Sequence, residues 1–187
     1  WSVGDVTNPV LPRSCNKPLQ ALGMVRLGLD LPPELLALAC ASHSGEPFHL
    51  DGVRRILALG GLDEDALQTP KDYPLDDCAK VAAIRAGEEP SSLAMNCSGK
   101  HAAMLLTCVV NGWDTATYRS PDHPLQQGIA TSFAELTGEP VAVTAVDGCG
   151  APLLSASLTG LARGFRALAV ATEGLEQRVA EAIRAHP

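Results

Sequence analysis

The spacing of apolar residues along the chain predicts a protein built mainly of helices. In six segments, apolar residues recur every three or four positions, which is the period of one helix face. These segments are residues 33–40, 47–59, 99–111, 124–136, 153–163 and 175–185. Residues 99–111 are apolar on nearly every side, so we expect this segment to form a buried central helix.

Strand signals are fewer. Residues 141–146 are mostly β-branched and lie between Pro140 and Asp147, which predicts one central strand, and residues 1–3 are a candidate for the end of another. One or two strands cannot form a sheet that covers these helices. Either the domain is mostly helical, or flanking sequence supplies the sheet. The second alternative fits better with a chain that starts at Trp1 and stops just after a helical pattern, so we expect truncation at both ends.

Composition and charge exclude several classes of function. The 187 residues have the length of one domain, so we treat residues 1–187 as a single unit. A formal net charge of −7 leaves no basic surface for a phosphate backbone, so nucleic acid is not an expected partner. No apolar run reaches the roughly 18–20 residues of a membrane span, and no signal-peptide pattern opens the chain. We therefore expect a cytoplasmic protein without a membrane partner.

The six cysteines fall into different settings. Cys40 and Cys108 lie in apolar helical segments, where a free thiol behaves as a small core residue. Because no secretory signal is visible, we expect reduced thiols. Cys97 and Cys149 stand apart because each lies near a glycine in a loop that leads into a predicted helix.

The first polar junction that could carry chemistry spans residues 13–18. Ser14 and Lys17 are three positions apart and would share one face of a helical turn. A lysine that accepts the serine proton gives an activated nucleophile without histidine. By itself the pattern is weak, and the structural alternative is a serine that caps a helix. Pro18 restricts the pair to the very start of any helix, where free N–H groups can stabilise an oxyanion.

Two further junctions precede predicted helices. In residues 40–46, helix capping is the simpler interpretation, and a serine in a proton relay is the alternative. In residues 96–101, Cys97 and His101 are four apart and would share a helix face as metal ligands, whereas the alternative is a buried cysteine beside a capping serine. The upstream glycine of a phosphate-binding loop is absent, so we reject nucleotide binding.

The segment after the predicted strand is a fourth candidate. Residues 147–152 contain two glycines that leave backbone amides accessible, and loops at the carboxyl end of a strand often bind ligands. Residues 122–124, Asp-His-Pro, are better explained as a helix cap than as a catalytic pair.

Taken together, these segments resemble the L-asparaginase II family of the rhizobial type. The resemblance rests on residues 13–18, 40–46, 96–101, 122–124 and 147–149, in this order and at these wide spacings. Several motifs in the right order are more specific than any one of them. The resemblance implies an α/β (α+β) fold like that of serine β-lactamases and penicillin-binding proteins. The chain would be a helix-rich fragment of that fold, around an antiparallel sheet.

The resemblance also implies a reaction and the residues that perform it. The reaction is hydrolysis of the side-chain amide of L-asparagine to L-aspartate and ammonia. Ser14 would be the nucleophile, Lys17 its proton acceptor and Ser42 a relay hydroxyl. The substrate-binding residues would be Arg13, His101 and Asp147.

Members of this family bind zinc near the site, and the resemblance assigns the ion to Cys97, Lys100 and Cys149. Thiolates are common zinc ligands, whereas lysine is an unusual one because it binds a metal only as the neutral amine. The family extends beyond Pro187 and carries a further lysine near the substrate there, and it has strands before Trp1. We also expect a homodimer.

Two other functions stay open at this point. Another Ser-x-x-Lys acyl hydrolase, an esterase or a peptidase, would use the same nucleophile but has no reason to place two thiols beside it. A zinc-stabilised module without enzymatic activity would need the thiols and not the serine.

Overall fold

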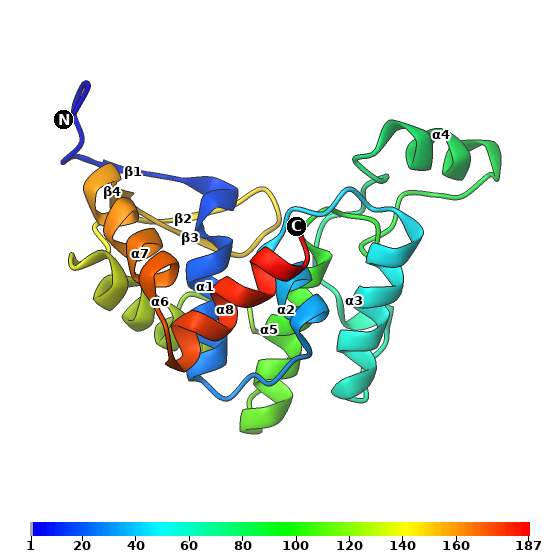
Figure 1. Cartoon of the computed structure of the whole chain (residues 1–187). Helices are drawn as coiled ribbons and strands as arrows, with labels where there is room; N and C mark the ends of the chain where they lie inside the picture. The colour runs from blue at the N-terminus through cyan, green and yellow to red at the C-terminus, as the bar shows by residue number, and fades with distance from the viewer. Residues whose placement is uncertain (1) are drawn as a thin grey trace.

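The computed structural model of the chain describes residues 2–187 and is dominated by helices in that range (Figure 1). The helices are α1 (Lys17–Arg26), α2 (Pro33–Cys40), α3 (Pro47–Leu59), α4 (Asp77–Arg85), α5 (Ser98–Asn111), α6 (Pro124–Thr137), α7 (Leu158–Val170) and α8 (Gly174–Ala185). The strands are β1 (Pro9–Val10), β2 (Thr144–Val146), β3 (Pro152–Leu154) and β4 (Ala156–Ser157), and short 3-10 turns occupy Arg13–Asn16 and Glu64–Ala66. No helix within residues 2–187 has both the length and the apolar character to cross a bilayer.

The strands form two small antiparallel pairs. β1 pairs with β4, with Pro9 opposite Ser157, and β2 pairs with β3, with Thr144 opposite Leu154. Figure 1 shows both pairs on the side of the molecule that carries α1, α6 and α7. The fold is therefore a mixed, helix-rich one with small antiparallel sheets, in agreement with the predicted α/β character.

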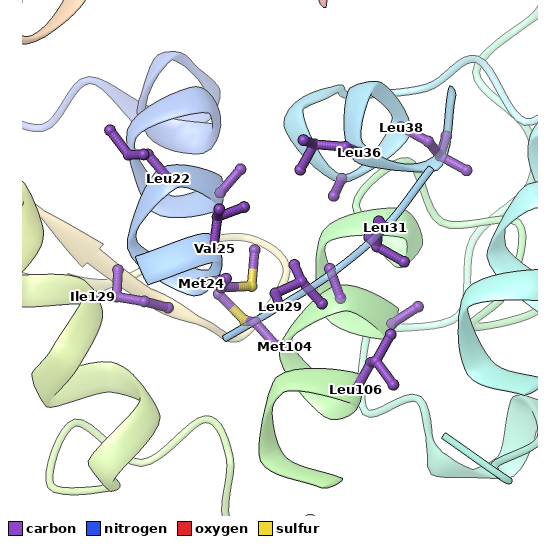
Figure 2. Packing of buried hydrophobic residues seen from close by; sticks show 14 of the residues in the cluster. Leu22, Met24, Val25, Leu29, Leu31, Leu36, Leu38, Met104, Leu106 and Ile129 are labelled. Atoms are coloured by element: carbon purple, nitrogen blue, oxygen red, sulfur yellow. The ribbon is translucent and has the colours of Figure 1, made fainter. Parts of the chain in front are cut away.

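The core lies where α1, α2, α5 and α6 meet. Leu22 and Met24 of α1, Met104 of α5 and Ile129 of α6 are fully buried, and Figure 2 shows their side chains converging with those of the segment between α1 and α2. Every residue from Ser98 to Cys108 in α5 is buried, which confirms the predicted central helix. Because α5 is enclosed on all sides, polar residues at its start must find partners inside the protein.

Helix boundaries follow the local signals closely. α2 and α3 begin and end at the predicted residues, and the predicted helices at 99–111, 124–136 and 175–185 are confirmed within one residue at each end. The predicted cap at residues 122–124 is also confirmed, because Nδ1 of His123 accepts a hydrogen bond from the backbone N–H of Leu125 at the start of α6.

The predicted helix at residues 153–163 is wrong in its first half. Pro152–Leu154 forms β3, and α7 begins only at Leu158, because the Ser157 hydroxyl caps the helix by accepting from the N–H of Gly160. The side chain of Asn16 donates to the carbonyl of Leu154 and so holds the segment extended. Contacts distant in sequence override the local apolar period here.

The predicted strand at residues 141–146 is confirmed only in its second half, and it is not central in a sheet. Only β2 forms, it pairs with β3 alone, and Val146 is 76% exposed. Ser2 and Val3 form no strand, and Trp1 lies outside the described residues. The sequence patterns also did not predict α1 and α4. Only Ala83 of α4 is buried, so this helix has almost no apolar face to predict it. Figure 1 shows α4 on an arm that projects from the other helices.

A close contact between α2 and α5 at Gly99 gives a test of this packing. A Cβ added at Gly99 would lie 2.8 Å from the carbonyl oxygen of Leu38. Gly99→Ala must push two helices apart, and overpacking of this kind costs about 1–3 kcal/mol. We expect the free energy of unfolding, measured by denaturant titration, to fall accordingly. The control is Gly60→Ala, whose added Cβ meets its nearest neighbour at 3.4 Å; similar losses in both variants would contradict the close contact.

Candidate active site

The most unusual side chain in the structure is the buried lysine at the start of α1. Lys17 is 1% exposed. Its Nζ donates to the carbonyl oxygen of Ala41 at 2.6 Å and to Oγ of Ser42 at 2.9 Å, with a longer contact to the carbonyl of Asn96 at 3.5 Å. The amine thus ties α1 to two loops, the one after α2 and the one before α5.

Burial also changes the acid–base properties of this amine. Loss of hydration lowers the pKa of Lys17 below its ordinary value, and the positive charge of Lys100 lowers it further, while Cys97 and Cys149 act in the opposite direction. A lysine with a lowered pKa has a larger neutral fraction near pH 7, and a neutral amine can accept a proton.

Ser14 precedes Lys17 by one turn and is exposed. It lies in the 3-10 turn Arg13–Asn16, and it is not the helix cap that the alternative interpretation required, since Asn16 occupies that position of α1. Within residues 2–187, no hydrogen bond joins the Ser14 hydroxyl to Lys17, whose hydroxyl partner is Ser42. The structure therefore leaves Ser14 accessible and connects the amine to the predicted relay serine.

Arg13 has a strained backbone next to Ser14. Its φ is 52°, a left-handed conformation that non-glycine residues rarely adopt and that often occurs at functional sites. Its Nε lies 3.2 Å from Oδ1 of Asp147, and the Arg13 side chain is 70% exposed whereas that of Asp147 is 7% exposed. This ion pair brings the loop after β2 to the turn that carries Ser14.

The thiols of Cys97 and Cys149 lie together in the interior beside Lys100. Both cysteines are free, and Nζ of Lys100 donates to Sγ of Cys149 at 3.3 Å. A hydrogen bond from Cys97 lowers the pKa of the Cys149 thiol, and the same contact raises the pKa of Cys97. The pair therefore favours one thiolate, on Cys149, held by a thiol and an amine.

The chemistry of these donors fits a zinc ion. Two sulfurs and an amine nitrogen converge here, which would leave one of the four tetrahedral positions open. No group of three or more histidine, cysteine, aspartate or glutamate side chains suited to a metal occurs in the described part of the chain. The further donor beside the two thiols is the amine of Lys100.

His101 lies behind the thiols. It is fully buried, and its Nδ1 is 2.6 Å from the hydroxyl of Tyr118. The other ring nitrogen, Nε2, is buried and makes no hydrogen bond within residues 2–187. The predicted substrate-binding residues thus differ in accessibility, since Arg13 reaches solvent and His101 does not.

A second buried histidine joins the loops that flank Lys17. His43 donates its backbone N–H to the carbonyl of Asn96, and its Nε2 lies 2.8 Å from Oγ of Ser98. Burial lowers the pKa of His43 to about 3, so this imidazole is neutral at pH 7. The Ser98 hydroxyl donates to the carbonyl of Leu93 and does not cap α5, in contrast to the capping alternative.

Ser42 lines a cavity of about 800 Å³ between α2, α3 and the end of α8. Its other polar lining residues include Ser44, Glu46 and His49, and the Ser44 hydroxyl donates to Oε2 of Glu46 at 2.6 Å. Ser14 is not among the lining residues. The cavity therefore reaches the hydroxyl partner of Lys17, Ser42, but does not include Ser14.

Sequence reasoning missed several members of this cluster. His43, Ser98 and Tyr118 were not assigned roles, and Tyr118 carries no local signal because it lies in a loop between helices without a recognisable motif. The only usable indication was composition, since Tyr118 is one of two tyrosines in the chain.

A lysine that is buried against one serine and follows an exposed serine by one turn is typical of hydrolases with a Ser-Lys pair. The family model described as L-asparaginase II matches residues 1–187, and the chain belongs to this family. The resemblance inferred from the motifs is thereby confirmed. No curated protein matches the chain. Family membership supports an asparaginase, a hydrolase that acts on a small amide.

Proposed function

We propose that the protein hydrolyses the side-chain amide of L-asparagine with Ser14 as nucleophile and Lys17 as its base. The observation that carries this proposal is the buried Lys17 amine, hydrogen-bonded to Ser42 and one turn from the exposed Ser14. Burial of an amine costs free energy, because its charged form loses hydration. A catalytic role for Lys17 explains why a lysine is kept at this buried position.

In the proposed reaction, the oxygen of Ser14 forms a bond to the amide carbon of asparagine while its proton passes through the Ser42 hydroxyl to neutral Lys17. The tetrahedral intermediate then collapses, the carbon–nitrogen bond breaks, and Lys17 returns the proton to the departing ammonia. Water, deprotonated in the same way, cleaves the resulting ester and releases aspartate. Each proton taken by the lysine is given back within the cycle.

The ion pair beside Ser14 is suited to hold the amino-acid part of the substrate. The exposed guanidinium of Arg13 can bind the α-carboxylate in a bidentate manner. Asp147, which holds Arg13 in place, can accept a hydrogen bond from the α-ammonium group. We assign His101 to the floor of the site because it is fully buried.

We further propose that Cys97, Lys100 and Cys149 hold a zinc ion. A zinc ion in this position would stabilise the loops and supply positive charge to the surrounding groups. We also propose a single domain with a fold related to that of penicillin-recognising hydrolases, assembled as a homodimer in the cytoplasm. The helix-rich arrangement with antiparallel strands is compatible with that fold.

Ser14→Ala is expected to lower kcat for asparagine by at least about a thousandfold, because loss of a nucleophile costs several orders of magnitude. The unfolding midpoint should hardly change, since the Ser14 side chain is exposed. Steady-state ammonia release and a thermal melt measure the two effects. The control is Ser120→Ala, in the loop before α6. Substantial turnover by Ser14→Ala would remove Ser14 from this role.

Lys17→Arg is expected to fail to restore activity, although it keeps the positive charge. Arginine does not release its proton near neutral pH and cannot act as the base. The variant should be compared with Lys71→Arg, a change at an exposed lysine. Wild-type rates of ammonia release from Lys17→Arg would show that Lys17 contributes only charge.

The double variant Cys97→Ser, Cys149→Ser is expected to lose zinc and to unfold at a lower temperature, because a metal that binds only the native state stabilises it. The matched control is Cys40→Ser, Cys108→Ser, which changes two other cysteines in helices and should keep the metal. Elemental analysis of protein purified without chelators gives the zinc content. Zinc near zero in the wild type would overturn the metal site and leave the Ser-Lys chemistry standing.

A further inference from the structure

The contact between His43 and Ser98 joins two buried polar side chains that lie 55 positions apart in sequence. His43 lies in the loop between α2 and α3, and Ser98 is the first residue of α5. Nε2 of His43 is 2.8 Å from Oγ of Ser98, and the same oxygen is 2.7 Å from the carbonyl oxygen of Leu93. Because a hydroxyl has one hydrogen to donate, the two contacts together determine which group donates in each.

The carbonyl of Leu93 sets the direction of both hydrogen bonds. A carbonyl oxygen only accepts, so the hydroxyl hydrogen of Ser98 points to Leu93, and the Ser98 oxygen accepts from His43. Nε2 of His43 therefore carries a hydrogen. Nδ1 of the same ring is buried and has no hydrogen-bond partner within residues 2–187. A second hydrogen on Nδ1 would have no acceptor there, so the satisfied form of the ring is the neutral Nε2–H tautomer.

The main chain of His43 is held to the same neighbouring segment as its ring. Its backbone N–H donates to the carbonyl oxygen of Asn96 at 3.1 Å. The residue before it is Ser42, whose Oγ accepts from Nζ of Lys17 at 2.9 Å. The bonds of His43 to Asn96 and Ser98 therefore limit where the Ser42 hydroxyl can lie relative to this amine.

We propose that His43 is a positioning residue that holds the Ser42 hydroxyl beside the amine of Lys17. It does so as a fixed Nε2–H donor to Ser98, which ties the segment of Ser42 to the start of α5. A proton passes between two groups only across a hydrogen-bond distance, so displacement of Ser42 slows the transfer. The effect on turnover rests on the proposed function, whereas the tautomer and the position of Ser42 do not.

The alternative is that His43 only fills space in the interior, and three replacements of the imidazole separate the two roles. Leucine keeps an apolar side chain at this position and removes the donor. Glutamine places its amide N–H near the position of Nε2, so it can still donate to Ser98. Asparagine has a shorter side chain and places its amide near Nδ1, where no partner lies within residues 2–187.

The kinetic test compares these variants in steady-state release of ammonia from asparagine. His43→Leu should lower kcat about tenfold, because partners behind catalytic groups and metal ligands commonly contribute about 10–100-fold. KM should change little, since the groups proposed to bind the amino acid lie elsewhere. His43→Gln should recover most of the lost rate, and His43→Asn should not. The matched control is His186→Leu, at an exposed histidine, which should behave like the wild type.

Two further measurements do not depend on activity. Long-range proton–nitrogen NMR of protein labelled with ¹⁵N-histidine, assigned by the signals lost in His43→Gln, should show a protonated Nε2 and an unprotonated Nδ1 in the wild type. In a crystal structure of His43→Leu, the separation of Ser42 Oγ and Lys17 Nζ should exceed the 2.9 Å of the wild type. If His43→Leu does not fold, the same separation is measured in His43→Asn.

Three results would overturn the proposal: a hydrogen on Nδ1 in the wild type, an unchanged separation of Ser42 and Lys17 in the variant without the donor, or equal losses of kcat in His43→Gln and His43→Asn. A wild type without asparaginase activity would contradict the proposed function instead. The NMR spectrum and the crystal structure would then still decide whether His43 positions Ser42.

Discussion

The amine of Lys17 has almost no access to water, and its hydrogen-bond acceptors all come from other parts of the chain. A buried polar group that loses its hydrogen-bond partners costs about 1–3 kcal/mol, and more if it is charged. The loops that carry Ser42 and Asn96 are therefore not free to move apart while the amine stays inside. His43 reinforces this constraint because it bonds to both Asn96 and Ser98. The arrangement of the loops around the proposed site follows from the need to exclude water from the Lys17 amine and still satisfy its hydrogen bonds.

The start of helix α5 carries most of the other polar groups of the candidate site. Cys97 ends the preceding loop, and Lys100 and His101 lie in the first turn, three and four residues later, so all of them reach the same side of the helix. Because α5 is buried over most of its length, these polar groups must be satisfied by one another or by the loops around them. Cys149 and Tyr118 supply those partners from distant segments.

The helices could be predicted from sequence because their boundaries depend on nearby residues. α2 and α3 show this, with a proline at each start and an apolar face that ends at a turn. The start of α7 could not be predicted, because Leu153 and Leu154 fit a helical period, and the distant contacts with β2 and Asn16 make them extended. The candidate site also has a part that local sequence predicts and a part that it does not. The spacing of Ser14 and Lys17 is local, whereas the partnership of Lys17 with Ser42 depends on tertiary contacts and was expected only through the family resemblance.

The ion pair between Arg13 and Asp147 spans 134 positions in sequence, and Lys17 meets Asn96 across 79. Contacts of such separation form late, because a long loop must close before they contribute any stability. The helices, which depend on neighbouring residues, can form much earlier. A refolding chain should therefore pass through a stage in which most of its helical circular dichroism has returned while the turn that carries Ser14 has no fixed neighbour. In a protein with such distant contacts, the circular dichroism of the helices and the activity of the site are recovered in separate kinetic steps.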